Sequence, residues 1–215
     1  RRRDRQPLGR LLPPQTAAFF RRKLEDAGVR FHFECGVTRI DPDGAGYRLG
    51  DDRGGSHAAD LVLSAVGLRP EIALAQAAGL EVKRGIVVDR RMRAQAAGAD
   101  LSGVYALGDC AEVAGLVLPF VMPIMQQAKA IAKSLAGTPT AVAYPAMPVV
   151  VKTPACPTAV CPPPAGAAGS WREEVTADGV KALFEDGAGR PLGFALAGAA
   201  AAERQVLAAQ MPPWL

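Results

Sequence analysis

The chain has 215 residues, of which 49% are hydrophobic and 21% are charged, a balance that can bury a core and excludes a disordered chain. The net charge of +4 is spread along the sequence, so it gives little support for a nucleic-acid interface. No apolar run reaches the roughly 18 residues of a membrane span, and none follows Arg1–Arg3 as a signal peptide requires. We therefore expect a cytoplasmic protein that binds neither nucleic acid nor a membrane.

Four cysteines lie at positions 35, 110, 156 and 161. They do not form the two close pairs of a zinc ribbon, so no metal site is expected. Cys156 and Cys161 have the separation of some redox-active disulfides, in which a helix N-terminus lowers the pKa of one thiol. Prolines on both sides of this pair exclude such a helix. This favours free buried thiols and leaves a redox disulfide as the alternative.

The first part of the chain predicts a helix followed by short strands. Apolar residues at helical spacing run through residues 17–27, and a glycine follows them. Alternating apolar and polar residues over 29–33 predict a strand. A hairpin is predicted at 37–49 and a second turn at 51–56, with His57 in the adjoining loop.

The middle of the chain predicts an α/β arrangement. The apolar run at residues 59–66 and the segment at 101–107 have the composition of strands buried on both faces of a parallel or mixed sheet. A helix at 71–78 and two shorter strands at 85–89 and 91–93 are expected between these strands, and a second helix is expected after them at 123–135.

After Thr138 the sequence becomes rich in proline, which predicts extended segments rather than helix. Three strands are expected at 171–175, 180–185 and 192–196, and a terminal alanine-rich helix is expected at 199–210. A domain boundary is expected near Tyr144, and the part that follows it predicts a small α+β domain.

The most informative motif is Val104–Asp109, with the sequence VYALGD. An apolar strand ends at Gly108, where the backbone can approach a ligand closely, and Asp109 then presents a carboxylate. Nucleotides bind at this edge of α/β sheets, where a fixed carboxylate can accept hydrogen bonds from sugar hydroxyls. A simple turn with a helix-capping aspartate is the alternative.

A second motif, Leu63–Pro70, repeats the pattern of an apolar strand that ends in glycine. In this order and at this spacing, the two motifs resemble those of pyridine-nucleotide-dependent flavoprotein reductases with two dinucleotide-binding domains. The resemblance implies that Val66 and Gly67 lie close to bound NAD(P)H. It also implies that Gly108 and Asp109 contact the ribityl chain of FAD. No catalytic side chain is implied, because the flavin carries the redox chemistry.

The segment Pro119–Gly137 predicts a helix whose N-terminus offers free N–H groups and the positive end of a dipole. In the family that the motifs resemble, the corresponding helix points at the flavin. The resemblance therefore implies backbone contacts to FAD at the start of this helix, from Met122, Pro123, Ile124 and Met125. The alternative is that these side chains are core residues.

The segment Tyr144–Pro157, with the sequence YPAMPVVVKTPACP, resembles the start of the C-terminal domain of rubredoxin reductases. This resemblance implies electron transfer from NAD(P)H through FAD to rubredoxin or a similar small acidic electron carrier. It places Lys152 near the flavin, where an ammonium group would stabilise negative charge on the reduced ring. An exposed surface lysine is the alternative.

The glycine-rich turns that bind the two pyrophosphates in this family are absent from the sequence. We therefore expect the C-terminal portion of a larger enzyme, with half of each cofactor site. The expected domains are the end of a Rossmann-like NAD-binding domain at 1–66, the end of an FAD-binding domain at 67–143, and the α+β domain at 144–215. A catalytically inactive interaction remnant of such a reductase is the alternative.

Overall fold

A computed structural model describes residues 4–96 and 103–215 of the chain. The chain divides into two compact units. The first unit comprises Arg1–Ala65 and Pro148–Met211, and the second comprises Val66–Met147 and Pro212–Leu215. The domain boundaries expected from the sequence stay a prediction, and the two units are described in turn.

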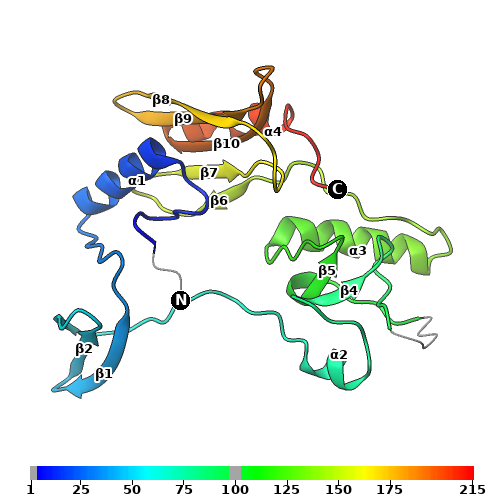
Figure 1. The fold of residues 1–215 in the computed structure, drawn as a ribbon, viewed down its shortest axis with the longest axis horizontal. Helices are drawn as coiled ribbons and strands as arrows, with labels where there is room; N and C mark the ends of the chain where they lie inside the picture. Colours follow the sequence, from blue (N-terminus) through cyan, green and yellow to red (C-terminus); the bar gives the residue numbers. More distant parts are fainter. Residues whose placement is uncertain (1–3, 97–102) are drawn as a thin grey trace. The chain divides into compact units, whose positions relative to one another are not determined.

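The first unit contains a five-stranded antiparallel sheet in the order β6-β7-β10-β9-β8 (Figure 1). The three predicted strands are confirmed, and two more form in the proline-rich segment. The bounds are Val149–Val151 for β6, Thr158–Cys161 for β7, Ser170–Val175 for β8, Gly179–Glu185 for β9 and Pro191–Gly198 for β10. Prolines flank β7 without interrupting it, as expected where the strand itself needs every N–H for its ladder.

Helix α1, Pro14–Asp26, confirms the first predicted helix. Gly28 follows it with a φ of +92°, a left-handed conformation that glycine adopts without strain. The buried side chains of Phe19 and Phe20 belong to one apolar cluster with Val160 and Val180 of the sheet. Helix α1 is therefore held by the same core as the five-stranded sheet.

A separate three-stranded antiparallel sheet consists of β1, Val37–Asp43, β2, Gly46–Asp51, and β3, Ser56–Ala59. The predicted hairpin is confirmed. The loop assignment of His57 is wrong, because His57 lies in β3 and pairs with Leu49.

The strand predicted at 29–33 does not form. The rings of Phe31 and Phe33 stack at a centroid distance of 5.2 Å, and the guanidinium of Arg21 lies 5.2 Å from the centroid of the Phe33 ring. Side-chain packing onto α1 thus takes the place of a strand ladder.

The described residues of the second unit form two helices, a 3₁₀ turn and a pair of short parallel strands. Their bounds are Ala73–Ala77 for α2, Ile86–Val88 for β4, Gly108–Cys110 for η1, Ala111–Val113 for β5 and Val121–Leu135 for α3. Both predicted helices and the first short strand are confirmed. Their core includes the buried side chains of Met92, Val113, Ile131, Tyr144 and Met147.

The strand predictions at 59–66, 91–93 and 101–107 in the middle region are wrong. Residues 60–72 form no strand, and Leu61, Leu63 and Val66 are 79–84% exposed. An apolar segment becomes a buried strand only between neighbouring strands, and the described residues supply none here. Residues 91–93 and 104–107 form no regular strand pair and are joined by an isolated bridge between Arg93 and Tyr105, while 101–102 lie outside the described residues.

The predicted terminal helix is replaced by two short elements. A 3₁₀ segment, η2, spans Ala199–Glu203, and helix α4 spans Arg204–Ala208. Ala201 and Leu207 are buried, so packing on the sheet overrides the strong helix propensity of alanine. Among the described residues, no helix is long and apolar enough to cross a membrane.

Candidate functional site

A cavity of about 160 Å³ lies within the second unit; we call it the Asp109 cavity. Side chains from four separate segments line it: Leu68, Arg69, Pro70, Arg84, Asp109, Val117 and Pro119. The two motifs singled out in the sequence therefore meet at one cavity, although the strands expected to carry them are irregular.

The backbone around Gly108 places Asp109 at this cavity. Leu107 is extended, Gly108 has a φ of +84°, and the chain then turns through η1. A side chain at Gly108 would be strained by this φ, although no atom lies within 4 Å of an added Cβ. The Asp109 side chain is exposed, so its carboxylate is accessible to a ligand.

Gln127 of α3 fixes this turn, and the sequence did not reveal it. Its Oε1 atom accepts a hydrogen bond from the Gly108 N–H at 2.6 Å, and its Nε2 atom donates one to the Tyr144 hydroxyl at 2.8 Å. Gln127 is only 2% exposed, and burial raises the pKa of Tyr144. The available signal was a glutamine at helical spacing from the buried residues Pro123 and Ala130.

Two arginines, Arg69 and Arg84, line the cavity together with Asp109. The sequence analysis did not identify Arg84. Glu112, 7% exposed, accepts hydrogen bonds from the N–H groups of Arg84 and Gly85 at 2.9 and 3.0 Å. A Cβ at Gly85 would lie 2.7 Å from the Cys110 carbonyl oxygen, so close packing demands glycine there. The cavity thus combines an acceptor, Asp109, with two guanidinium donors, Arg69 and Arg84.

Val66 and Gly67 precede the first lining segment. Val66 is 79% exposed, and Gly67 has a φ of +102° with no atom within 4 Å of an added Cβ. Glycine is required there by the backbone conformation, which turns the chain towards Leu68–Pro70.

The start of α3 leaves apolar side chains exposed. Met122 is 43% and Met125 is 52% exposed, whereas Pro123 is buried and Ile124 is partly buried. The alternative reading as core therefore fails for the two methionines. Of these four residues, only Met122 has an N–H group that is free by its position, because Pro123 has none and later N–H groups bond within the helix.

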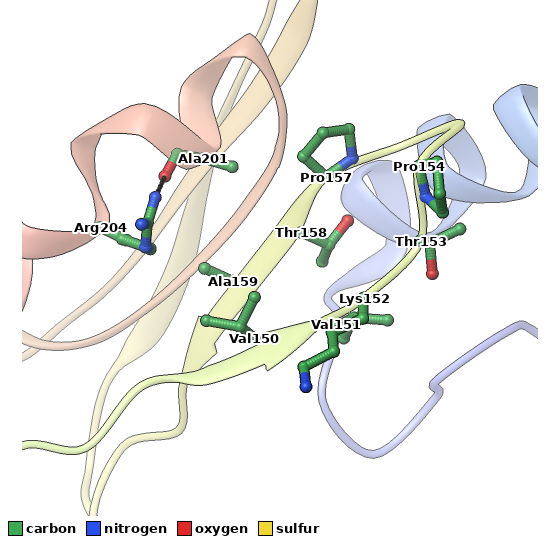
Figure 2. A pocket seen from close by; sticks show the side chains of 10 residues that line it. All are labelled: Val150, Val151, Lys152, Thr153, Pro154, Pro157, Thr158, Ala159, Ala201 and Arg204. Carbon is green, nitrogen blue, oxygen red and sulfur yellow. Dashed lines mark hydrogen bonds between the residues drawn. The ribbon is translucent and has the colours of Figure 1, made fainter.

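Lys152 lies in the first unit, next to a second cavity of about 330 Å³, which we call the Lys152 cavity. Its lining comes from β6, β7, the loop between them and the η2–α4 segment: Val150, Val151, Lys152, Thr153, Pro154, Pro157, Thr158, Ala159, Ala201 and Arg204 (Figure 2). Lys152 is exposed and directly follows the end of β6 at Val151, and its expected place near the flavin stays a prediction.

The four cysteines form no disulfide bond with one another, and Cys156 and Cys161 are buried. The Cys156 thiol lies 3.8 Å from the Thr158 hydroxyl. Cys161 belongs to β7, so no helix begins at this pair. The alternative of a redox disulfide is therefore not supported.

Two family models match the chain. Residues 2–134 match the model described as "Pyridine nucleotide-disulphide oxidoreductase", and residues 141–211 match "Rubredoxin binding C-terminal domain". The chain is 45% identical over 212 residues to a rubredoxin-NAD(+) reductase of Alcanivorax borkumensis, covering 96% of this chain and 54% of the relative. It is 43% identical over 210 residues to one of Acinetobacter baylyi, covering 97% and 52%. The chain thus spans about half the length of these curated relatives.

Solved structures share the fold at lower identity. A ferredoxin reductase from Rhodopseudomonas palustris superposes with a TM-score of 0.80 at 21% identity, over 97% of this chain and 52% of that one. An NADH:rubredoxin oxidoreductase from Clostridium acetobutylicum gives a TM-score of 0.66 at 18% identity, over 96% and 49%. These likenesses show a mixed α/β fold.

Proposed function

This chain belongs to the pyridine nucleotide-disulphide oxidoreductase family, and we propose that it serves electron transfer from NAD(P)H through FAD to rubredoxin or a similar small acidic carrier. The observation that carries the proposal is the Asp109 cavity, where the two glycine-ended motifs meet. A region that matches a rubredoxin-binding domain follows in the same chain.

The residues of the Asp109 cavity fit part of a dinucleotide. Its volume of about 160 Å³ is below the roughly 300–1,000 Å³ of pockets that enclose a complete drug-sized ligand. The Asp109 carboxylate is suited to accept hydrogen bonds from a polyol chain, and the Arg69 and Arg84 guanidinium groups are suited to phosphate oxygens. We therefore assign the ribityl and phosphate portion of FAD to this cavity.

Bound FAD would supply the hydride and single-electron chemistry, and the chain's own residues would position it. The Met122 N–H, at the positive end of α3, is suited to an electron-rich ligand edge. The exposed side chains of Met122 and Met125 provide apolar contact beside it. We assign Pro123 and Ile124 to holding this first turn in place, and Val66 and Gly67 to the NAD(P)H side of the site.

The proposed architecture keeps the three segments expected from the sequence. Residues 1–66 belong to a Rossmann-like NAD-binding domain, 67–143 to an FAD-binding domain and 144–215 to a small α+β domain. The two regions matched by the family models, 2–134 and 141–211, support a boundary near Tyr144. We also propose a cytoplasmic location, as expected for a chain whose four cysteines form no disulfide bond with one another.

The Lys152 cavity is our candidate for the rubredoxin-docking surface. Its apolar lining is bordered by two cationic side chains, Lys152 and Arg204, and it lies in the region that matches the rubredoxin-binding domain. Positive charge beside an apolar patch suits an acidic carrier, because it speeds association and fixes the orientation of docking.

Two binding measurements test the proposal. FAD uptake is followed by quenching of flavin fluorescence, and rubredoxin binding is followed by calorimetry at several salt concentrations. We expect FAD to be retained, and we expect rubredoxin affinity to fall as salt increases. A protein that takes up no FAD yet binds rubredoxin would support the alternative of an interaction module. Failure of both would overturn the proposed function.

A further inference from the structure

Gln127 is placed to do more than fill the core of the second unit. Its amide joins Gly108, directly before the candidate ligand carboxylate, to Tyr144, more than thirty residues further along the chain. Gln127 itself lies in α3, five residues after Met122. One side chain thus connects both elements to which we assign FAD contacts.

The orientation of this amide is fixed by its partners. Gly108 presents an N–H, which needs an acceptor, so Oε1 must face it, and Nε2 then faces the Tyr144 hydroxyl. Tyr144 is 1% exposed, and its backbone is tied to the C-terminal segment. Its N–H donates to the Leu215 carbonyl at 2.9 Å, and its carbonyl accepts from the Trp214 N–H at 2.7 Å.

The N–H of Gly108 has no strand ladder to satisfy it, because residues 106–107 are irregular and η1 begins at Gly108. Without Gln127, this partly buried N–H would lose its partner, and the turn would no longer be held against α3. The position of Asp109 relative to the first turn of α3 would then be less defined. Ligands that contact both elements bind best when the two are already held at the correct separation.

We propose that Gln127 is a positioning residue of the cofactor site. Gln127 holds Asp109 at a fixed separation from the start of α3, and Tyr144 orients the Gln127 amide. This inference rests on the proposed function, since FAD is the ligand that would contact both elements. Gln127 does not contact the ligand itself in this proposal.

Substitutions at position 127 separate hydrogen bonding from packing. Gln127→Met keeps most of the side-chain volume and removes both hydrogen bonds. Gln127→Glu can keep both while its carboxyl group is protonated, because the carbonyl oxygen then accepts from the Gly108 N–H and the O–H donates to the Tyr144 hydroxyl. An ionised carboxylate at this buried position would add a desolvation penalty. Gln126→Met is the matched control, one position away in the same helix and only partly buried.

The readouts are the FAD dissociation constant of the full chain and hydrogen exchange at the Gly108 amide. We expect Gln127→Met to weaken FAD binding about tenfold, as for the loss of one hydrogen bond, and to speed Gly108 exchange. Gln126→Met should stay close to the unsubstituted protein in both readouts, and Gln127→Glu should approach it as the pH falls and its buried carboxyl group is protonated. Tyr144→Phe should give a smaller change in the same direction as Gln127→Met.

Equal FAD affinity in the Gln127→Met and Gln126→Met variants would overturn the proposal. So would a Gln127→Met variant that binds FAD more weakly without faster Gly108 exchange, because the loss would then come from packing rather than from the hydrogen bond to Gly108. If the unsubstituted chain takes up no FAD, the proposed function fails for it, and Gly108 exchange alone decides. Unchanged exchange in Gln127→Met would then overturn the positioning role.

Discussion

Removing the Glu173 carboxylate should release the N-terminus of α1 from the five-stranded sheet. The Oε1 atom of Glu173 accepts hydrogen bonds from the Thr16 N–H at 2.7 Å and the Thr16 hydroxyl at 2.8 Å. Its Oε2 atom accepts one from the Gln15 N–H at 3.1 Å. Pro13, at the N-cap position, makes no side-chain cap, so a strand residue caps this helix instead.

The expected cost follows from these three bonds. Loss of a helix N-cap costs about 1 kcal/mol, and a buried hydroxyl left without its partner costs about 1–3 kcal/mol. Thr16 is fully buried, so its hydroxyl cannot turn to water. We therefore expect Glu173→Ala to lower the free energy of unfolding of the first unit by about 2–4 kcal/mol.

The assay is urea denaturation of the full chain, with Glu174→Ala as the matched control. Glu174 is exposed and pairs with Arg172 at the surface, so its removal should change stability by less than about 0.5 kcal/mol. A double-mutant cycle with Thr16→Val measures the coupling directly. Additivity of the two substitutions within about 0.3–0.5 kcal/mol would refute the bond to the Thr16 hydroxyl. A Glu173→Ala effect no larger than that of Glu174→Ala would refute the capping role.

Three further predictions concern charges at the candidate sites and at the three-stranded sheet. Asp109→Ala should weaken FAD binding about ten- to hundredfold, as for a lost charge-assisted hydrogen bond, with little change in stability because the side chain is exposed; unchanged affinity would contradict the assignment. The hydrogen bond from His57 holds the pKa of Asp51 well below its ordinary value, so Asp51 stabilises the fold above the unfolded pKa of about 4 and loses this effect as pH falls through the lowered folded value. Asp51→Asn should therefore flatten the acid side of a stability–pH profile, and a profile that stays parallel to the original would count against it. Lys152→Met should make the flavin midpoint potential more negative if the ammonium acts on the flavin, or weaken the salt dependence of rubredoxin turnover if it acts in docking; no change in either would leave Lys152 without a role.

Elements governed by local signals could be predicted from the sequence. Helices α1 and α3 are amphipathic and each is followed by a glycine, Gly28 or Gly137, with a positive φ. The hairpin of β1 and β2 needs only its own turn at Gly44. In each case the determining residues lie within a few positions of the element.

Elements that depend on distant partners could not be predicted. The run at 59–66 has a strand's composition, yet whether it becomes a strand depends on neighbours elsewhere in the sequence. His57 lies in a strand because Leu49 pairs with it. The polar residues beside His57 indicate a loop, so the sequence around it does not predict this pairing. A short polar segment can complete a sheet when the adjacent strand already presents its free edge.

The same distinction separates the parts of the candidate site. Gly67, Gly108 and Asp109 carry recognisable patterns, whereas Arg84 reaches the cavity through the pairing of β4 with β5 and the contact of Glu112. Gln127 occupies a position in α3 that the helical pattern reserves for an apolar side chain. A buried polar residue in such a stripe requires partners, and this requirement directs attention to it before the partners are known.

Exposure and order are combined at Asp109 in a way that bears on its affinity for a ligand. An exposed carboxylate on a flexible loop would have to be ordered on binding, and that loss of freedom would offset part of the contact energy. Here Gly108 is constrained on one side by its left-handed conformation and on the other by the amide of Gln127. Asp109 therefore stays hydrated and accessible while its backbone is already fixed. The conformational entropy of this turn is therefore lost when the protein folds rather than when the ligand binds, because the bond to Gln127 forms with the core of the second unit.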